Sequence, residues 1–385
     1  MTTKNNIPVG YKDSAVGVIP QEWEVKLLED LCENICSGNN KERNKYGKYR
    51  IYGSTGIIGY SNTYSYNTPT ILIARVGANA GIINKGEGEY DVSDNTLIVC
   101  NNKFIYDYEF AYNQLANYNL NKLVFGSGQP LVTAGQLKHI KLAIPPLAEQ
   151  RKIAEILGVW DEAIEKQSRL IEKLELCKRA LMQHLLTGRI RLPGFNTPWQ
   201  KVKLGEIFKE RNETKCEHLP LLSITADRGL ILQSESDKKD TSNDDKSKYK
   251  RICPNDIGYN TMRMWQGRSA LSAMEGIVSP AYTIVTPKVE VDPLFISELI
   301  KQPRVVYDFW THSQGLVGDT LNCKFHDFSQ VKVAIPSLPE QKAIAEVLTV
   351  ADKEIASHRK KLDALRLQKR GLMQQLLTGK TRVKM

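Results

Sequence analysis

A long internal repeat constrains the fold of this chain more than any other feature of its sequence. Residues 144–188 and 335–379 align without a gap at a constant offset of 191 positions, and about half of the aligned residues are identical. Both copies begin with Ile-Pro and end with Leu-Leu-Thr-Gly followed by a basic residue. Because the copies lie far apart, the repeat indicates a duplicated two-part chain rather than a solenoid of stacked units.

Each copy is predicted to form one long helix. Its apolar residues recur at alternating intervals of four and three, which is the spacing of a coiled-coil seam. Gly188 and Gly379 suit the left-handed residue that commonly ends a helix. At about 1.5 Å per residue, each helix is a rod on the order of 60 Å long.

We expect the two helices to pair with each other in antiparallel fashion. The alternative is that each helix packs on its own domain, but one narrow seam is too small to bury a long helix that is otherwise charged. Gln167 and His358 fall near the middle of the seam, where polar residues lower stability but can fix the register. The residues predicted to pair the helices are Ile153, Leu157, Trp160, Ile164, Gln167, Ile171, Leu174, Ile344, Leu348, Ile355, His358, Leu362 and Leu365.

The rest of the chain forms two segments of similar size, called here the first head (residues 1–143) and the second head (192–334). The repeat segments between and after them are residues 144–191 and 335–385. Both heads contain short β-type runs, such as residues 70–74 and 282–285, broken by Gly, Asn and Asp turns. The prediction is an α+β protein: two α/β heads with twisted sheets, joined by two long helices in a pseudo-twofold antiparallel coiled coil.

The net charge of +10 lies mostly outside the heads. Residues 144–192 and 335–385 carry eight of the ten excess positive charges, and the heads are nearly neutral. Contact between the heads and nucleic acid would therefore depend on local basic clusters that also hold aromatic or amide side chains, because Lys and Arg neutralise phosphates while Arg and Gln read base edges. The candidate DNA-contacting residues are Lys41, Arg43, Lys45, Lys48, Arg50, Arg75, Lys248, Lys250, Arg251, Arg263, Gln266 and Arg268.

Signatures of catalysis, of a bound cofactor and of a metal site are not visible in the sequence. It has no Walker A motif, no complete dinucleotide fingerprint, no His-Glu-x-x-His and no Gly-x-Ser-x-Gly. The seven cysteines form no Cys-x-x-Cys pair. With neither a signal peptide nor an apolar run long enough to span a membrane, we expect a cytoplasmic, non-catalytic binding protein with reduced thiols and no cofactor.

The repeated motif Ile-Pro-x-Leu-x-Glu-Gln-x-x-Ile-Ala-Glu…Leu-Met-Gln-x-Leu-Leu-Thr-Gly, alternating with two unlike heads, resembles the specificity subunits of Type I restriction-modification systems. The resemblance covers essentially the whole chain. It implies that each head is a target-recognition domain for one half of a split, asymmetric site in double-stranded DNA. It also implies that the helices set the spacing and dock two DNA methyltransferase subunits, to which restriction (translocase and nuclease) subunits attach.

Two other functions fit the same sequence features. One is the recognition subunit of a Type II enzyme with a combined methyltransferase and nuclease partner, and the other is a helical scaffold that binds no DNA. The sequence leaves open which bases are recognised, how long the spacer is, and which head residues contact bases rather than phosphates. It also leaves open whether the basic C-terminal helix contacts DNA or the methyltransferase.

Overall fold

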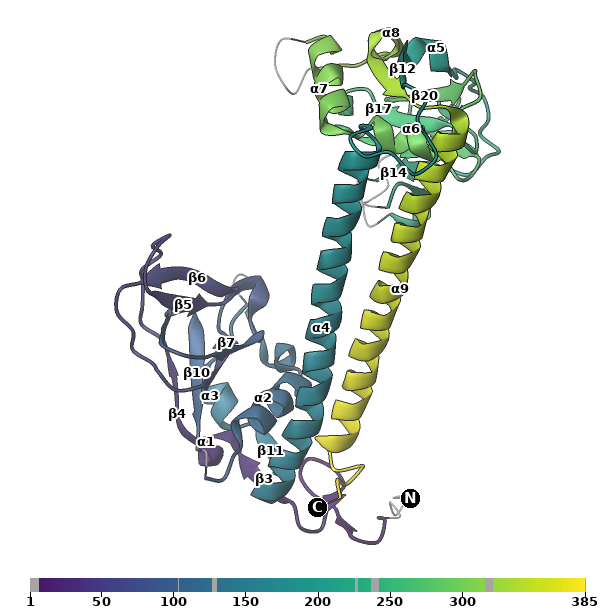
Figure 1. The fold of residues 1–385 in the computed structure, drawn as a ribbon. Helices are drawn as coiled ribbons and strands as arrows, with labels where there is room; N and C mark the ends of the chain where they lie inside the picture. Colours follow the sequence, from purple (N-terminus) through teal and green to yellow (C-terminus); the bar gives the residue numbers. More distant parts are fainter. Residues whose placement is uncertain are drawn as a thin grey trace. The chain divides into compact units, whose positions relative to one another are not determined.

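The structure is a computed structural model that describes residues 7–102, 104–126, 130–225, 228–236, 242–315 and 321–384. The chain divides into two compact units: unit 1 contains residues 1–168 and 360–385, and unit 2 contains residues 169–359 (Figure 1). Each unit thus holds one head and a part of both long helices. The units cut across the four segments proposed from the sequence, and the boundaries of those segments stay a prediction.

The first head is built on a four-stranded antiparallel sheet in the order β4-β10-β7-β8. A second sheet has the order β6-β5-β9, in which β5 and β9 run parallel. The elements of this head are β1 (Tyr11–Lys12), β2 (Ile19–Pro20), β3 (Glu24–Leu27), α1 (Leu28–Leu31), β4 (Cys32–Ser37), β5 (Tyr49–Gly53), β6 (Gly56–Ser61), β7 (Thr70–Ala74), η1 (Gly77–Asn79), β8 (Ile83–Gly86), β9 (Tyr90–Val92), β10 (Thr96–Asn101), α2 (Tyr108–Asn117), η2 (Leu120–Leu123), α3 (Ala134–Lys138) and β11 (Lys141–Ile144).

Strand β7 is a continuous apolar run because both of its faces are covered. All five of its residues are buried. Ile71 and Ile73 belong to the main core with residues of α2 and α3, while Leu72 packs on the opposite face with Tyr90 and Ile98. A strand covered on both sides cannot show the alternation of a half-exposed strand. The β-run predicted at residues 70–74 is confirmed in its full extent.

The second head repeats the strand order of the first. Its four-stranded sheet is β13-β20-β17-β18, again antiparallel throughout. The predicted run at 282–285 lies within β20, and the α+β class is confirmed. The elements are β12 (Gln200–Lys203), α5 (Leu204–Ile207), β13 (Phe208–Glu210), β14 (Leu222–Ile224), β15 (Leu230–Leu232), η3 (Gln233–Glu235), β16 (Lys250–Ile252), β17 (Ile257–Asn260), η4 (Met264–Gln266), β18 (Ser269–Leu271), β19 (Gly276–Val278), β20 (Tyr282–Pro287), α6 (Pro293–Leu299), α7 (Pro303–His312), α8 (Phe325–Gln330) and β21 (Lys332–Ile335).

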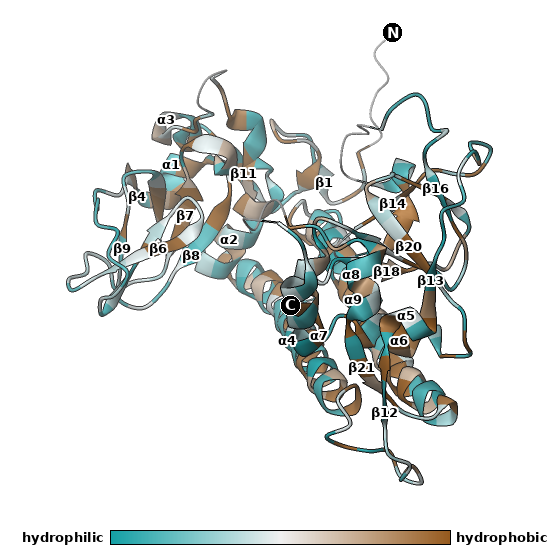
Figure 2. Cartoon of the chain, turned by 90° about the horizontal axis from the view of Figure 1, so that it is seen from above, coloured by the Kyte–Doolittle hydropathy of each residue, from teal (hydrophilic) through white to brown (hydrophobic). Residues whose placement is uncertain are grey.

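The two repeat segments form the helices α4 (Leu147–Leu185) and α9 (Leu338–Leu376), each of 39 residues (Figure 1). Figure 2 shows hydrophobic and hydrophilic residues alternating along α4, as a seam with charged flanks requires. Of the predicted pairing residues, Ile153, Leu157, Gln167, Ile171, Ile344, Leu348, Ile355 and Leu362 are buried, and Trp160, Ile164, Leu174, His358 and Leu365 are half-buried.

The helices run antiparallel within each unit, as expected. In unit 1, Asp161 of α4 accepts from Lys369 of α9 at 2.6 Å, and Leu157 shares a core with Leu376. In unit 2, the equivalent ion pair joins Asp352 and Lys178, also at 2.6 Å. Gln167 and His358 belong to different units, so their predicted placement in neighbouring layers stays a prediction.

The residues that follow each helix tie it to the start of the other helix in the same unit. Gly188 and Gly379 adopt left-handed φ values of 68° and 71°, which confirms the predicted caps. Beyond them, Arg191 donates to both carboxylate oxygens of Glu340 at 2.6 and 2.7 Å. In unit 1, Arg382 donates to Glu149 at 2.7 and 3.0 Å. We call these two contacts the helix clamps; both glutamates are almost completely buried.

Candidate nucleic-acid interface

The reading loop (residues 261–268) connects β17 to β18 in the second head. Met264 is fully buried at its centre and anchors it. The short helix η4 within the loop ends at Gly267, whose φ of 72° lies in the left-handed region that suits glycine. Inside it, the backbone N–H of Gln266 donates to the backbone carbonyl of Arg263 at 2.9 Å. This turn leaves the side chains of Arg263, Gln266 and Arg268 exposed together.

These three predicted side chains border one cavity of about 460 Å³. The structure therefore brings together residues that the sequence could place only in one run. Gln266 and Arg268 also line a second cavity of about 480 Å³, together with Lys301. The first cavity is completed by Ile224 of β14, Thr225 directly after it, Asn260 of β17 and Tyr282 of β20.

The cavity is rich in donors that remain available. In the described part of the chain, the side chains of Gln266 and Arg268 make no hydrogen bond or ion pair. Burial raises the pKa of Tyr282, although a hydrogen bond from Asn260 and the charge of Arg268 act in the opposite direction. The phenol thus stays protonated at neutral pH. A guanidinium fork and a side-chain amide can each form paired hydrogen bonds with a base edge.

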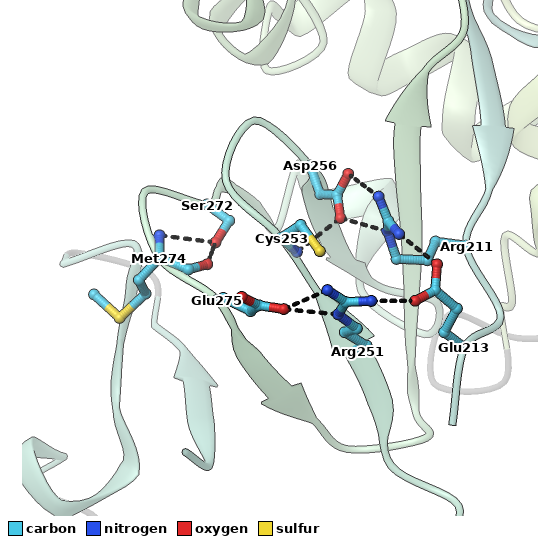
Figure 3. A network of polar contacts seen from close by, with 8 residues as sticks. All are labelled: Arg211, Glu213, Arg251, Cys253, Asp256, Ser272, Met274 and Glu275. Atoms are coloured by element: carbon cyan, nitrogen blue, oxygen red, sulfur yellow. Dashed lines mark hydrogen bonds and ion pairs between the residues drawn. The ribbon is translucent and has the colours of Figure 1, made fainter. Parts of the chain in front are cut away.

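The basic run at residues 248–251 behaves differently. Arg251 donates to Glu275 Oε1 at 2.8 and 2.5 Å and to Glu213 Oε2 at 2.8 Å (Figure 3). These hydrogen bonds raise the pKa of Arg251, and the contact with Arg251 lowers the pKa of Glu213. Arg251 is therefore engaged within the head. Lys250 lies 3.6 Å from Glu210, and Lys248 is exposed.

A second arginine, Arg211, extends this network (Figure 3). Arg211 donates to the buried Asp256 at 2.7 Å and also binds Glu213, so two arginines and three carboxylates share one chain of contacts. Asp256 additionally accepts from the Cys253 amide at 2.8 Å. Charged groups that are out of water need such partners. The sequence suggested a basic surface here, whereas the structure pairs Arg251 with two carboxylates in a network that is buried at Asp256 and partly exposed at Arg251.

The predicted residues of the first head gather around the β5–β6 hairpin. Lys41, Arg43, Lys45, Lys48 and Arg50 are all exposed. Aromatic rings lie among them: Lys48 Nζ is 4.9 Å from the Tyr49 ring, and the exposed Tyr46 is 5.5 Å from Lys45 Nζ. A hydrogen bond to Tyr49 raises the pKa of Lys48. Basic side chains beside aromatic rings suit a nucleic-acid backbone and its unstacked bases.

Arg75 lies apart from this hairpin in the chain, directly after β7. It is half-buried, and its Nε is buried without a hydrogen-bond partner among the described residues. Its backbone joins two other segments, since its amide donates to Asn95 at 2.9 Å and its carbonyl accepts from Val132 at 2.8 Å. Arg75 therefore belongs to a different element from the other candidates of this head.

The loop after β7, residues 75–82, is the counterpart of the reading loop. The paired residues Ile73 and Ile83 enclose nine residues, as do Tyr259 and Ser269. The Ala74 amide donates to the Ile82 carbonyl, as Asn260 does to Arg268, and Gly81 is left-handed like Gly267. The positions of Asn260, Arg263, Gln266 and Arg268 are occupied by Ala74, Gly77, Ala80 and Ile82.

The two heads thus place different side chains at the equivalent positions of the same backbone turn, and the arginine of the first loop, Arg75, stands at another position. Sequence reasoning missed this correspondence because the two loops share almost no residues. It also missed Thr225, which follows β14, Asn260 at the end of β17 and Tyr282 at the start of β20. One signal could have revealed that the two loops correspond. The number of residues between the preceding strand and the left-handed glycine is the same in both heads.

Metal chemistry and membrane insertion find no support in the described residues. No group of three His, Cys, Asp or Glu side chains there is arranged to hold a metal ion. No helix in the same part of the chain combines the length and apolar character needed to cross a bilayer.

Known proteins resemble this chain over most of its length. Residues 20–176 and 294–367 match the profile of the Type I restriction modification DNA specificity domain. The MjaX chain of Methanocaldococcus jannaschii, which carries the name of a type I restriction enzyme specificity subunit, is 26% identical over 97% of both chains. The MjaVIII specificity subunit of the same organism is 25% identical over 95% of this chain and 94% of its own.

Solved structures share the fold. The S subunit of a Type I restriction-modification system from M. genitalium has a TM-score of 0.59 at 16% identity and covers 100% of this chain and 99% of its own. A chain from a study of complex assembly and conformational transition of the type I R-M system has a TM-score of 0.58, also at 16% identity, and covers 94% and 99%.

The family match spans more than half of the chain, and the chain belongs to the Type I restriction modification DNA specificity family. It is the specificity subunit of such a system and is not itself an enzyme. The two alternatives suggested by the sequence, a Type II recognition subunit and a scaffold that binds no DNA, are not favoured.

Proposed function

We propose that the two heads each read one half of a bipartite, asymmetric site in double-stranded DNA. The paired helices set the distance between the half-sites and dock two methyltransferase subunits. Restriction subunits join through these, and the assembly acts in the cytoplasm. The chain supplies recognition, while the adenine to be methylated is flipped into a pocket of the partner enzyme.

The contrast between the reading loop and its counterpart supports this proposal most directly. A duplicated protein with identical loops would read the same bases twice. Here one loop offers Arg263, Gln266 and Arg268, and the other has Gly77, Ala80 and Ile82 at these positions and carries its arginine, Arg75, at a different one. Donors of the first kind discriminate between bases, which small apolar groups cannot do by hydrogen bonding. The half-sites should therefore differ in sequence.

The contacting groups differ between the heads accordingly. In the second head, we assign base reading to Arg263, Gln266 and Arg268, and phosphate contacts to Lys248 and Lys250. Arg251 is left out because two carboxylates already hold it. In the first head, the proposed contacts are the exposed lysines and arginines around the β5–β6 hairpin together with Arg75, which follows β7. These residues are Lys41, Arg43, Lys45, Lys48, Arg50 and Arg75.

Mapping methylated adenines across the genome, with and without this gene, tests the proposed function. We expect one gene-dependent motif made of two unlike halves separated by an unspecified spacer. A symmetric motif would contradict the assignment of different half-sites to the two heads. Methylation that does not change when the gene is removed would contradict the function as a whole.

The length of the helix pair should determine the preferred length of the DNA spacer between the half-sites. Inserting seven residues after Leu174 of α4, with a matching seven after Ile355 of α9, keeps the seam in register because seven is the coiled-coil period. The ion pairs Glu175–Arg359 and Lys178–Asp352 flank this level of unit 2. Seven residues add about 10 Å, or roughly three base pairs of spacer.

We expect the insertion variant to prefer a longer spacer with both half-sites unchanged. Its affinity should be lower, because three base pairs also rotate one half-site by about 100° around the DNA axis. Binding to a series of duplexes that differ only in spacer length measures the shift. An unchanged preferred spacer would show that the helices do not set the distance.

A further inference from the structure

The second cavity beside the reading loop lies between helix α6 and β18, the edge strand of the sheet. Its volume is about 480 Å³, which is within the range of cavities that hold small organic groups. Gln266 and Arg268 line this cavity as well as the first one. DNA held by the reading loop would therefore lie next to this second space.

The wall of the second cavity combines apolar side chains with polar groups that lack partners. Leu271 of β18 and Leu294 of α6 supply apolar surface. The hydroxyl groups of Ser269 and Ser297 are buried and have no hydrogen-bond partner among the described residues, and Ser297 is only 1% exposed. A buried polar group without a partner is unfavourable. These hydroxyls therefore point to a ligand that supplies one.

An ion pair in the same wall places a donor and an acceptor side by side. Lys301 Nζ donates to Glu298 Oε1 at 2.8 Å, and both residues line the cavity. The other carboxylate oxygen of Glu298 has no hydrogen-bond partner in the described part of the chain. This carboxylate disfavours a phosphate group in the cavity, because like charges repel at short range. An uncharged ligand with both donors and acceptors fits the wall better.

The corresponding place in the first head is occupied by a tyrosine. Helices α2 and α6 both begin after a capping aspartate, Asp107 or Asp292, and the fifth residue after it is Tyr112 in α2 and Ser297 in α6. Tyr112 is half-buried, and Lys85 Nζ of the edge strand β8 lies 4.7 Å from its ring centroid. A serine in place of this ring leaves room between α6 and β18.

We infer that the second cavity receives the thymine that is left unpaired when the adenine opposite it is flipped into the methyltransferase. The inference rests on the proposed function and gives the second head a further role, which is to hold the base opposite the methylated one. Thymine is a flat ring whose pairing edge presents an N–H between two carbonyl oxygens. Glu298 can accept from the N–H and Lys301 can donate to a carbonyl, while Leu271 and Leu294 cover the ring.

Holding the thymine lowers the free energy needed to flip the adenine. Taking a base out of the duplex costs stacking and pairing energy. Hydrogen bonds and apolar contacts to the remaining base offset part of that loss and keep the pair from re-forming. Because Tyr112 occupies the corresponding place in the first head, we expect this effect only in the half-site of the second head.

Duplexes with an abasic site in place of that thymine test the inference, with the full-length chain bound to its methyltransferase subunits. Removing the thymine frees the adenine for flipping and should tighten binding. The wild type also loses its contacts with the thymine, so its gain in affinity should be smaller. In Ser297→Tyr, which fills the cavity with the residue of the first head, we expect a gain about tenfold larger than in the wild type, as measured by competition binding.

A second variant and a chemical probe support the same test. Glu298→Gln keeps the size of the side chain but removes the carboxylate, and its gain should also exceed that of the wild type. Permanganate oxidises unstacked thymines, so it should modify this thymine more in the Ser297→Tyr complex than in the wild-type complex. Glu290→Gln is the matched control, because Glu290 is an exposed carboxylate of the same head that lines neither cavity. It should show the gain of the wild type.

The outcomes separate the inference from the proposed function. An equal gain in the wild type, Ser297→Tyr and Glu298→Gln would overturn the capture of the thymine. The same difference between variants in the half-site of the first head would also overturn it. Failure of the wild-type complex to bind a duplex with both half-sites would instead contradict the proposed function. Unfolding temperatures equal to that of Glu290→Gln exclude misfolding, and Glu298→Gln carries the test alone if Ser297→Tyr does not fold.

Discussion

Replacing Arg268 with alanine will relax recognition of one half-site and leave the other intact. Arg268 borders the two cavities described above, beside Gln266, and in the described part of the chain no carboxylate engages it. A base contact by such a side chain contributes about 1–3 kcal/mol of discrimination, which corresponds to roughly a 5- to 150-fold change in preference. Gln266→Ala should act in the same way, on the same half-site.

Competition binding with duplexes altered in one half-site at a time measures this effect. Arg304→Ala is the matched control: Arg304 is an exposed arginine of the same head, on α7, and does not line either cavity. It should leave the preference unchanged. Equal loss of both half-sites in Arg268→Ala would indicate a general defect in folding or assembly and would remove the reading loop from the interface.

The long helices could be predicted from sequence because their signal is local. A seam residue recurs every three or four positions, so each helix can be recognised from the residues of a few turns. The observed ends at Leu185 and Leu376 fall just before the predicted glycine caps. Strand β7 was also readable, since five consecutive apolar or β-branched residues, Thr70–Ala74, stand between turn signals.

The arrangement of the sheets could not be read in the same way. Strand β10 pairs with β4 and β7, and β5 pairs with β9 in parallel, across segments far apart in the chain. No local pattern states which strands meet. The β7–β8 and β17–β18 turns became comparable only when these pairings fixed the residues at each end. The chemical contrast between the heads is therefore a result of the structure.

Arg251 is a single-residue example of the same problem: the sequence does not reveal which distant residues it contacts. It lies in a run with Lys248, Lys250 and a tyrosine, which favours a nucleic-acid surface. Its partners Glu213 and Glu275 are 38 and 24 residues away, and only folding brings them within 2.8 Å of it. A local count of charges cannot reveal such compensation. Gln266 and Arg268, in contrast, keep the exposure that their sequence suggested.

The helix clamps were missed for a related reason, although their residues are repeated. Arg191 and Arg382 follow the glycine caps at the same interval, and Glu340 and Glu149 lie in the first turn of the partner helices. Recurrence showed that these residues matter, but not that they meet. In each unit the clamp joins the end of one helix to the start of the other, which fixes the antiparallel pair at that end.

The two clamps should differ in strength, because their carboxylates have different partners. Glu149 accepts from Arg382 and also from Trp23 Nε1 at 3.0 Å. Glu340 is fully buried and, among the described residues, accepts from Arg191 alone. The equivalent nitrogen of Trp199 is buried and has no partner in the same part of the chain. Removing Arg191 thus leaves a buried charge with no donor, which is the costlier situation.

We therefore expect Arg191→Ala to destabilise unit 2 more than Arg382→Ala destabilises unit 1, with a loss on the order of several degrees in Tm. Hydrogen exchange resolved along the chain assigns each loss to its unit, and calorimetry gives the shift. Adding Glu340→Gln to Arg191→Ala should restore part of the lost stability, since an amide without a donor is less unfavourable in a buried site than a carboxylate. Equal effects of the two arginine variants, or no recovery in the double variant, would show that Glu340 finds other partners and that the clamp of unit 2 does not depend on Arg191.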